Sequence, residues 1–172
     1  MSPRRLLLLR HAEATPHVLT QSGDRARALT PKGQEQAASI GRQLSQLDLP
    51  RPIQIQCSPA TRTRQTAQAV LDALGNTPAT LTIDDSLYSA TADDLYGLVH
   101  ATPETVQTLL LVGHNPTIGD FACDLLGPAL QNAAFSALNR GYPLAGLTVL
   151  DIPVPWLDVR PSTIEPLRLL QP

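Results

Sequence analysis

Cysteine and aromatic residues are scarce in this sequence of 172 residues, which has two cysteines and 3% aromatic side chains. Cys57 and Cys123 are too few for a framework of disulfides, and no group of Cys and His residues has the spacing of a zinc site. A free cysteine behaves as a small hydrophobic residue, so we expect both thiols to be buried. The composition therefore excludes a scaffold that depends on disulfides or on structural zinc.

Strong charge of one sign and long apolar runs are also lacking. The 13 Lys and Arg residues nearly balance the 15 Asp and Glu residues, which leaves a net charge of −2. Binding to nucleic acid or to a membrane surface needs an accumulated positive field, so we expect neither partner. The apolar run Leu6–Leu9 is too short for the hydrophobic part of a signal peptide or for a membrane span. We therefore expect a cytoplasmic protein.

The sequence does contain an alternation of short apolar strands and amphipathic helices. Continuous apolar runs such as Leu6–Leu9 are typical of strands buried on both faces of a parallel sheet. Strands are predicted at residues 6–9, 53–57, 81–83, 109–112 and 147–152, and helices at 30–47, 58–74, 93–100 and 115–126. This alternation predicts an α/β sandwich with a mostly parallel central sheet.

The rest of the chain is less regular. Residues 128–146 have weak periodicity, which predicts loops or short helices, and the prolines from Pro153 onward confine any later strand to a sheet edge. No linker, internal repeat or low-complexity tract divides the sequence. A chain of this length fits one domain, residues 1–172, better than two.

Polar side chains follow three of the predicted strands at the point where each strand ends. Arg10 and His11 follow the first strand, Ser58 and Arg62 the second, and His114 the strand at 109–112. Ligands of open α/β sheets bind at the carboxyl ends of the strands, so we expect these side chains to meet in one cavity.

Arg62 and His114 stand where an anion is favoured. With Ser58 as N-cap, Arg62 lies in the first turn of its helix, where the helix dipole disfavours a cation unless an anion is bound there. His114 precedes a helix start at Asn115-Pro116, whose free backbone N–H groups favour an anion. Arginines together with two helix N-termini predict a phosphate site.

A histidine that follows a strand is, taken alone, more often a hydrogen-bonded structural residue than a catalyst. The interpretation as a phosphate site therefore depends on the whole set of arginines and histidines. His17 and His100 have no comparable context, and we expect both at the surface.

Four segments resemble the motifs of a known family. Leu8–Glu13 resembles the Arg-His-Gly signature of the histidine phosphatase (phosphoglycerate mutase-like) superfamily, and Leu29–Ala37 its Leu-Thr-x-x-Gly-x-x-Gln-Ala helix start. Ser58–Ala67 is similar to its Ser-Pro-x-x-Arg-Ala-x-Gln-Thr-Ala element, and Val112–Pro116 to its second-histidine motif. Any one motif is weak evidence, but four in the family's order, over residues 6–117, are a specific signal.

The resemblance implies a three-layer sandwich with a phosphoglycerate mutase-like fold and a mechanism that uses a histidine nucleophile. His11 would attack phosphorus and form a phosphohistidine that water hydrolyses. Arg10, Arg62 and His114 would hold the phosphoryl oxygens. Arginine suits this role because its planar fork binds phosphate through two hydrogen bonds and keeps its charge.

The sequence departs from the family's pattern where a general acid usually stands. Leu87–Ser89 lacks the Glu of the mutases, and Asn115 replaces the Asp of the acid phosphatase branch. Ala12 replaces the signature Gly, which is a small change. This pattern, without the large capping insertions, resembles the SixA type of phosphohistidine phosphatase. That resemblance adds Arg27 and Asn115 to the expected phosphate-binding residues.

The resemblance implies a phosphatase that needs no metal or other cofactor and acts on phosphohistidine in a protein. Imidazole leaves a phosphoramidate more readily than an alkoxide leaves an ester, so help from a general acid matters less. A small-molecule phosphomonoesterase with the same nucleophile is the alternative, with Glu13, Asp84 or Asp93 as proton donor. The third interpretation is a weakly active module that binds phosphate or phosphoproteins. The expected partner is a phosphorylated protein or a small phosphorylated metabolite.

Overall fold

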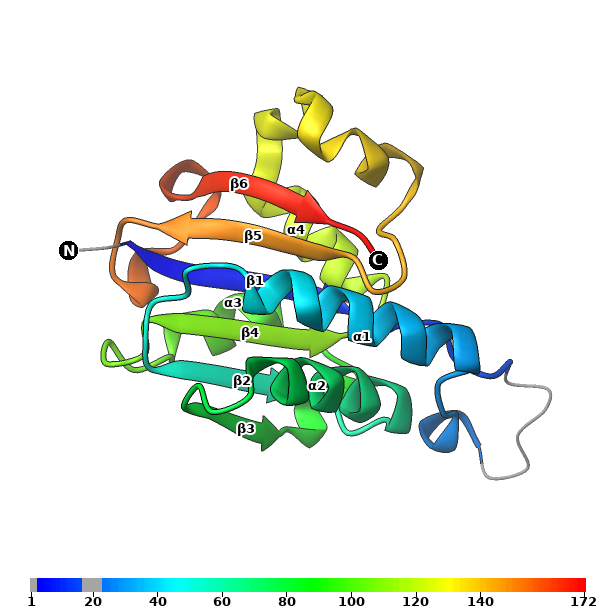
Figure 1. Cartoon of the computed structure of the whole chain (residues 1–172). Coiled ribbons are helices and arrows are strands. Elements are labelled where there is room, and N and C mark those ends of the chain that lie inside the picture. Colours follow the sequence, from blue (N-terminus) through cyan, green and yellow to red (C-terminus); the bar gives the residue numbers. More distant parts are fainter. Residues whose placement is uncertain (1–2, 17–22) are drawn as a thin grey trace.

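The computed structural model describes residues 3–16 and 23–172, and its six strands form one sheet in the order β3-β2-β4-β1-β5-β6 (Figure 1). The strands are β1 (Arg4–Arg10), β2 (Ile53–Cys57), β3 (Ala79–Ile83), β4 (Thr108–Gly113), β5 (Leu147–Ile152) and β6 (Glu165–Leu170). The pairs β2–β3, β2–β4 and β1–β4 are parallel, whereas β5 runs antiparallel to β1 and β6 antiparallel to β5. The sheet is thus mixed, with a parallel part and an antiparallel edge.

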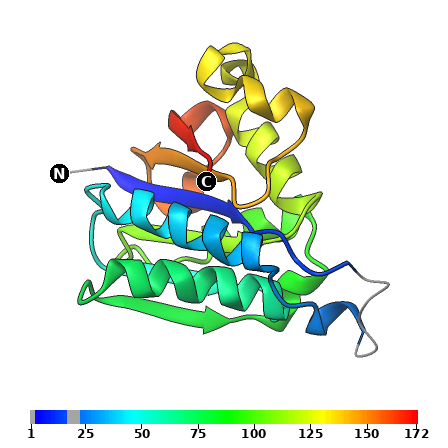
Figure 2. The ribbon, with the colours of Figure 1, turned by 45° about the vertical axis from the view of Figure 1, so that its right-hand side comes forward.

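Helices cover both faces of this sheet, as the three-layer prediction requires (Figures 1 and 2). Helices α1 (Pro31–Ser45) and α2 (Thr61–Leu74) pack on one face, and α3 (Ala92–His100) and α4 (Thr117–Leu126) on the other. Short 3-10 helices connect these elements at η2 (Asp24–Ala26), η3 (Asp85–Tyr88), η4 (Gly127–Gln131), η5 (Ala133–Arg140), η6 (Trp156–Asp158) and η7 (Pro161–Thr163). None of the helices in the described part of the chain is long and apolar enough to cross a membrane.

Strand β1 lies inside the sheet and is buried on both faces. The four leucines Leu6–Leu9 are all 0% exposed. Because successive side chains of a strand point to opposite faces, Leu6 and Leu8 pack with α3 and α4, while Leu7 and Leu9 pack with α1 and α2. This double burial explains the continuous apolar run and places the end of β1, with Arg10 and His11, between the two helical layers.

Helix α1 begins in close contact with the loop that follows β1. Thr30 is its N-cap, as predicted, and its hydroxyl accepts a 3.0 Å hydrogen bond from the Gly33 amide. A Cβ atom at Gly33 would lie 1.9 Å from the Glu13 carbonyl oxygen. Only glycine fits at this contact, which ties the start of α1 to the loop beside His11.

Two helix starts differ from the prediction. Helix α2 begins at Thr61 with Ala60 as N-cap, because the Ser58 hydroxyl is instead bonded to the ring of His114. Helix α4 begins at Thr117, directly after the Asn115-Pro116 start that the sequence predicts. The loops that carry Ser58 and His114 therefore extend further beyond their strands than the sequence indicates.

Two expectations about burial are wrong and one cannot be compared. His100 is half-buried in the last turn of α3, where its Nε2 lies 2.9 Å from the Val159 carbonyl oxygen, so it is not a simple surface residue. Cys57 is buried as expected, but Cys123 is only half-buried because it lies at the margin of the apolar face of α4. His17 lies outside the described residues.

Candidate active site

Side chains at the carboxyl ends of β1 and β4, on α2 and in the loop before α1 line one cavity of about 360 Å³. The cavity is lined by Arg10, His11, Glu13, Ala14, Arg27, Arg62, His114, Asn115 and Leu144. The structure therefore brings together in one place the arginines, the two histidines, Glu13 and Asn115 that the sequence predicts for the site. This place is the edge of the sheet where ligands of α/β folds bind.

His11 lines the cavity, and one of its ring nitrogens has no hydrogen-bond partner in the described part of the chain. Its Nδ1 lies 2.7 Å from the carbonyl oxygen of Ala12, and a carbonyl only accepts, so Nδ1 carries the ring proton and Nε2 keeps its lone pair. The side chain is buried, which lowers the pKa of His11 to about 3, with His114, Arg62 and Arg10 acting in the same direction. The imidazole is consequently neutral at pH 7, the form that acts as a nucleophile.

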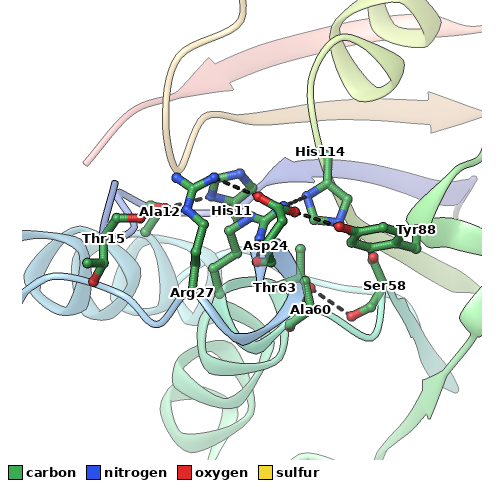
Figure 3. Close-up of polar contacts among 11 residues, drawn as sticks. His11, Ala12, Thr15, Asp24, Arg27, Ser58, Ala60, Thr63, Tyr88 and His114 are labelled. Atoms are coloured by element: carbon green, nitrogen blue, oxygen red, sulfur yellow. Dashed lines mark hydrogen bonds and ion pairs between the residues drawn. The ribbon is translucent and has the colours of Figure 1, made fainter. Parts of the chain in front are cut away.

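His114 lies next to His11, with the two ring centroids 5.4 Å apart (Figure 3). Its Nδ1 is 3.3 Å from Arg62 Nη2, and its Nε2 is 2.7 Å from Ser58 Oγ. Because a guanidinium only donates, Nδ1 is the acceptor and Nε2–H donates to Ser58. Burial, followed by the charge of Arg62, lowers the pKa of His114 to about 4. Both imidazoles are therefore neutral.

Arg10 and Arg62 hold buried donors that have no partner among the described residues. The Nε atoms of both side chains are buried and lack a hydrogen bond there. Arg10 donates from Nη1 to the Tyr142 carbonyl oxygen at 2.6 Å, and the side chain of Arg62, in the first turn of α2, is only 7% exposed. An unpaired buried N–H is costly, so these donors favour an oxyanion in the cavity.

Asp24 and Tyr88 also belong to this arrangement, although sequence reasoning missed them. The Asp24 carboxylate, from η2, accepts hydrogen bonds from Arg27, Arg62 and Tyr88 (Figure 3). Tyr88 comes from η3, and its ring packs edge-on against His114 with centroids 5.7 Å apart. Asp24 lies in a polar loop without periodicity, and nothing in the sequence indicated its partners.

Ser58 has a different role from the one predicted. It is fully buried, and its hydroxyl bonds the His114 ring instead of capping α2. This contact fixes the orientation of His114, whose tautomer is set by the Arg62 donor at Nδ1. Helix α2 begins only at Thr61, so Ser58 lies outside it.

The candidate proton donors are poorly placed for that task. The Glu13 carboxylate accepts a 2.9 Å bond from the Thr30 hydroxyl and lies 3.3 Å from Lys32 Nζ, and both contacts lower the pKa of Glu13. Asp84 accepts from the Ser86 amide at the start of η3, and Asp93 is exposed in the first turn of α3. Neither lines the cavity, and the carboxyl group that does, Glu13, is held as an anion.

Asn115 lies in the cavity wall, and one N–H of its side-chain amide is engaged. Its Nδ2 donates to the Tyr142 carbonyl oxygen at 3.2 Å, the same oxygen that accepts from Arg10. Asn115 thus supports the backbone that holds Arg10. The first turn of α4 does not contribute to the described lining of the cavity, and α2 contributes through the Arg62 side chain, so the positive charge comes from arginines more than from helix ends.

No cluster of three or more His, Cys, Asp or Glu side chains that could hold a metal ion is found in residues 3–16 and 23–172. The cavity contains three guanidinium groups, from Arg10, Arg27 and Arg62, and the neutral imidazole of His11. This arrangement can hold a phosphoryl group against an attacking nitrogen.

Comparisons with known proteins agree with this chemistry. Residues 6–106 match the model of the histidine phosphatase superfamily (branch 1). An uncharacterised protein of Mycobacterium tuberculosis (strain ATCC 25618 / H37Rv) is 33% identical over 141 residues, which cover 81% of this chain and 85% of that protein.

Two solved structures are similar over the whole chain. A protein from Nakamurella multipartitia, provisionally assigned as the phosphohistidine phosphatase SixA, has a TM-score of 0.83 and 30% identity and covers 100% of this chain and 98% of its own. One from Agrobacterium tumefaciens, assigned in the same way, has a TM-score of 0.80 and 31% identity and covers all of both chains.

The chain therefore belongs to the histidine phosphatase superfamily and is a phosphatase with a phosphoglycerate mutase-like fold. Within that superfamily it is of the SixA type.

Proposed function

We propose that this protein removes the phosphoryl group from phosphohistidine in a protein, without a metal ion, through a covalent intermediate on His11. The observation that carries the proposal is the neutral His11, with Nε2 free, in a cavity walled by three arginines and by no neutral carboxyl group of the described chain. Such a site suits a substrate whose leaving group departs without an acid. The similarity to two SixA proteins supports the same substrate class.

The first step transfers the phosphoryl group between two imidazoles. Nε2 of His11 attacks phosphorus, and the bond from phosphorus to the substrate's ring nitrogen breaks, with its electron pair staying on that nitrogen. The substrate ring carries a proton from water on its other nitrogen, so it leaves as neutral imidazole. The bond from His11 Nδ1–H to the Ala12 carbonyl stabilises the positive charge that the ring gains. In the second step water attacks phosphorus, inorganic phosphate leaves and His11 returns to its neutral form.

The phosphoryl oxygens would be held by the arginines. Arg10 and Arg62 have buried Nε donors without a partner in the described chain, and Arg27 stands in the same wall. His114 holds Arg62 through its Nδ1, and it can donate to a phosphoryl oxygen only after taking up a proton there. Donors aimed at the transferring group typically contribute a factor of about 100 or more to the rate.

A small-molecule phosphomonoesterase is the second candidate, and one observation favours it. Glu13 lies in the cavity wall, where a bound phosphoryl dianion would raise its pKa and restore a proton donor. In that case the partner is a small phosphorylated metabolite instead of a phosphorylated protein. Alkyl phosphates would then be cleaved efficiently.

The experiment that separates the two is a substrate panel. The value of kcat/KM is measured for a phosphohistidine-containing protein and for sugar, nucleotide and amino-acid phosphates, with His11→Ala as the inactive control. The proposal predicts that the phosphohistidine protein is the best substrate. A higher kcat/KM for an alkyl phosphate would favour the second candidate.

The cytoplasmic location expected from the sequence stays a prediction.

A further inference from the structure

The Asp24 carboxylate joins two of the arginines that wall the cavity. Its Oδ1 accepts from Arg27 Nη1 at 2.9 Å, and its Oδ2 accepts from Arg62 Nη2 at 2.9 Å. The Tyr88 hydroxyl donates to the same Oδ2 at 2.6 Å. Each carboxylate oxygen therefore binds one guanidinium group, and Tyr88 fixes the carboxylate from a third side (Figure 3).

Asp24 binds the arginines of the cavity wall but is not itself among the lining residues. Arg27 and Arg62 line the cavity, whereas Asp24 and Tyr88 do not. The backbone of Asp24 takes part as well, because its carbonyl oxygen accepts from Arg62 Nη1 at 2.8 Å. Asp24 therefore binds Arg62 at Nη1 and Nη2, which leaves the buried Nε without a partner in the described chain and available to a phosphoryl group.

We propose that Asp24 is a positioning residue that sets Arg27 and Arg62 at a fixed spacing for a bound phosphoryl group, with Tyr88 fixing Asp24. The inference rests on the proposed function, because it assigns these arginines to the substrate's phosphoryl oxygens. Asp24 itself touches neither the substrate nor the reacting atoms.

A charge is needed at this place because two guanidinium groups that meet at one cavity repel each other. A carboxylate between them offsets the repulsion and binds each group through a charge-assisted hydrogen bond. An amide has one acceptor oxygen, so it can satisfy only one of the two arginines, and its NH2 group would face the other. Asp24→Asn should therefore release one arginine while changing the shape of the side chain very little.

The chain offers a matched control for the change of charge. Asp85, in the neighbouring 3-10 helix η3, has a side chain that is 85% exposed and contacts only Arg25, at 3.6 Å, among its ion pairs in the described residues. Asp85→Asn removes the same charge from the same side of the molecule without touching Arg27 or Arg62. A difference between the two variants then reports the contacts of Asp24 and not the overall charge.

The test is calorimetric binding of inorganic phosphate, with kcat and KM measured on the same proteins. Asp24→Asn should weaken phosphate binding about tenfold or more and raise KM, since hydrogen bonds to charged groups are worth about that factor. Tyr88→Phe removes one of the three donors to Asp24 and should have a smaller effect in the same direction. Asp85→Asn should bind phosphate like the wild type.

A double-mutant cycle separates positioning from a general loss of structure. If Asp24 acts through the arginines, Asp24→Asn should cost much less affinity in an Arg27→Ala background than in the wild type. Equal cost in both backgrounds would overturn the inference. Thermal unfolding of each variant checks that it is folded, and Tyr88→Phe keeps the test decisive if Asp24→Asn does not fold.

The outcomes distinguish this inference from the function on which it rests. Wild-type protein that binds no phosphate and forms no phosphoenzyme would overturn the proposed function. Wild-type protein that binds phosphate while Asp24→Asn binds it equally well, or more tightly, would overturn the inference alone. Tighter binding would mean that the carboxylate competes with phosphate for the arginines.

Discussion

At the scale of single residues, the two cavity histidines make stability depend on pH. The pKa is about 3 for His11 and about 4 for His114 in the folded protein, against about 6.5 in an unfolded chain. Between about pH 6.5 and pH 4 the unfolded chain therefore binds protons that the folded protein does not. The free energy of unfolding should fall as the pH decreases through this range.

Chemical denaturation at a series of pH values tests this prediction. Replacing both histidines, as His11→Asn with His114→Asn, should make stability less dependent on pH between 4 and 6.5. Asp24 does not interfere, because its pKa is held below the usual range by Tyr88 and the two arginines, so its stabilising contribution is lost only below about pH 4. An unchanged slope in the double variant would show that the histidines are not held neutral.

Glu13 gives a second prediction at this scale. If no carboxyl group donates a proton, kcat/KM should depend steeply on the pKa of the leaving group, and phosphoramidates and aryl phosphates should be cleaved far faster than alkyl phosphates. Glu13→Gln should then change little. The measurement is kcat/KM for a series of phosphate esters in both proteins. A flat dependence in the wild type that becomes steep in Glu13→Gln would identify Glu13 as the acid.

The site residues that could be predicted from the sequence are those next to a regular strand or helix. His11, Arg62 and His114 come directly after strands or in the first turn of a helix, and the order of strands in an α/β sheet places such residues together. Asp24 and Tyr88 reach the site from η2 and η3, which have no periodicity. Their positions depend on how these loops pack, and local sequence does not encode that.

At the scale of elements, the contact between α1 and the loop after β1 gives a prediction about glycine. A Cβ at Gly33 would lie 1.9 Å from the Glu13 carbonyl oxygen, so Gly33→Ala must move α1 or the loop beside His11. We expect the free energy of unfolding to fall by about 1–3 kcal/mol and kcat/KM to fall as well. Denaturant unfolding and steady-state kinetics measure the two effects.

Gly97 provides the control for this variant. It lies inside α3, and a Cβ there would meet no atom within 4 Å. Gly97→Ala should therefore leave activity unchanged and raise stability by up to about 1 kcal/mol, since alanine favours a helix more than glycine does. Equal behaviour of the two variants would argue against the close contact at Gly33.

The elements themselves were predictable where burial determines their pattern. The apolar runs of β1 and β4 are buried on both faces, and α1 has the predicted cap at Thr30. The helix starts at α2 and α4 were placed too early. At α2 the Ser58 hydroxyl binds His114, a residue distant in sequence, and at α4 no side chain caps the helix. Strand β6 contains a proline and lies at the sheet edge, where the sequence analysis confined any late strand. Its antiparallel pairing with β5 could not be predicted from the local sequence.

At the scale of the whole molecule, the charge of the phosphoryl group is met by side chains from separate elements. Arg10 ends β1, Arg27 follows η2 and Arg62 lies in the first turn of α2. Since these arginines supply the positive charge in the proposed mechanism, turnover should survive incubation with EDTA. Loss of turnover on chelation that is restored by added metal would contradict the proposal.

The central claim is that His11 carries the phosphoryl group, and trapping of the phosphoenzyme tests it most directly. The protein is mixed with a radiolabelled phosphohistidine-containing protein, quenched in alkali and digested, and the label is located by peptide. A parallel sample of His100→Asn controls for histidines outside the cavity. The account predicts an acid-labile label on the peptide that contains His11, present in the wild type and in His100→Asn and absent from His11→Ala. Turnover without a trapped label, or a label that persists in His11→Ala, would contradict it.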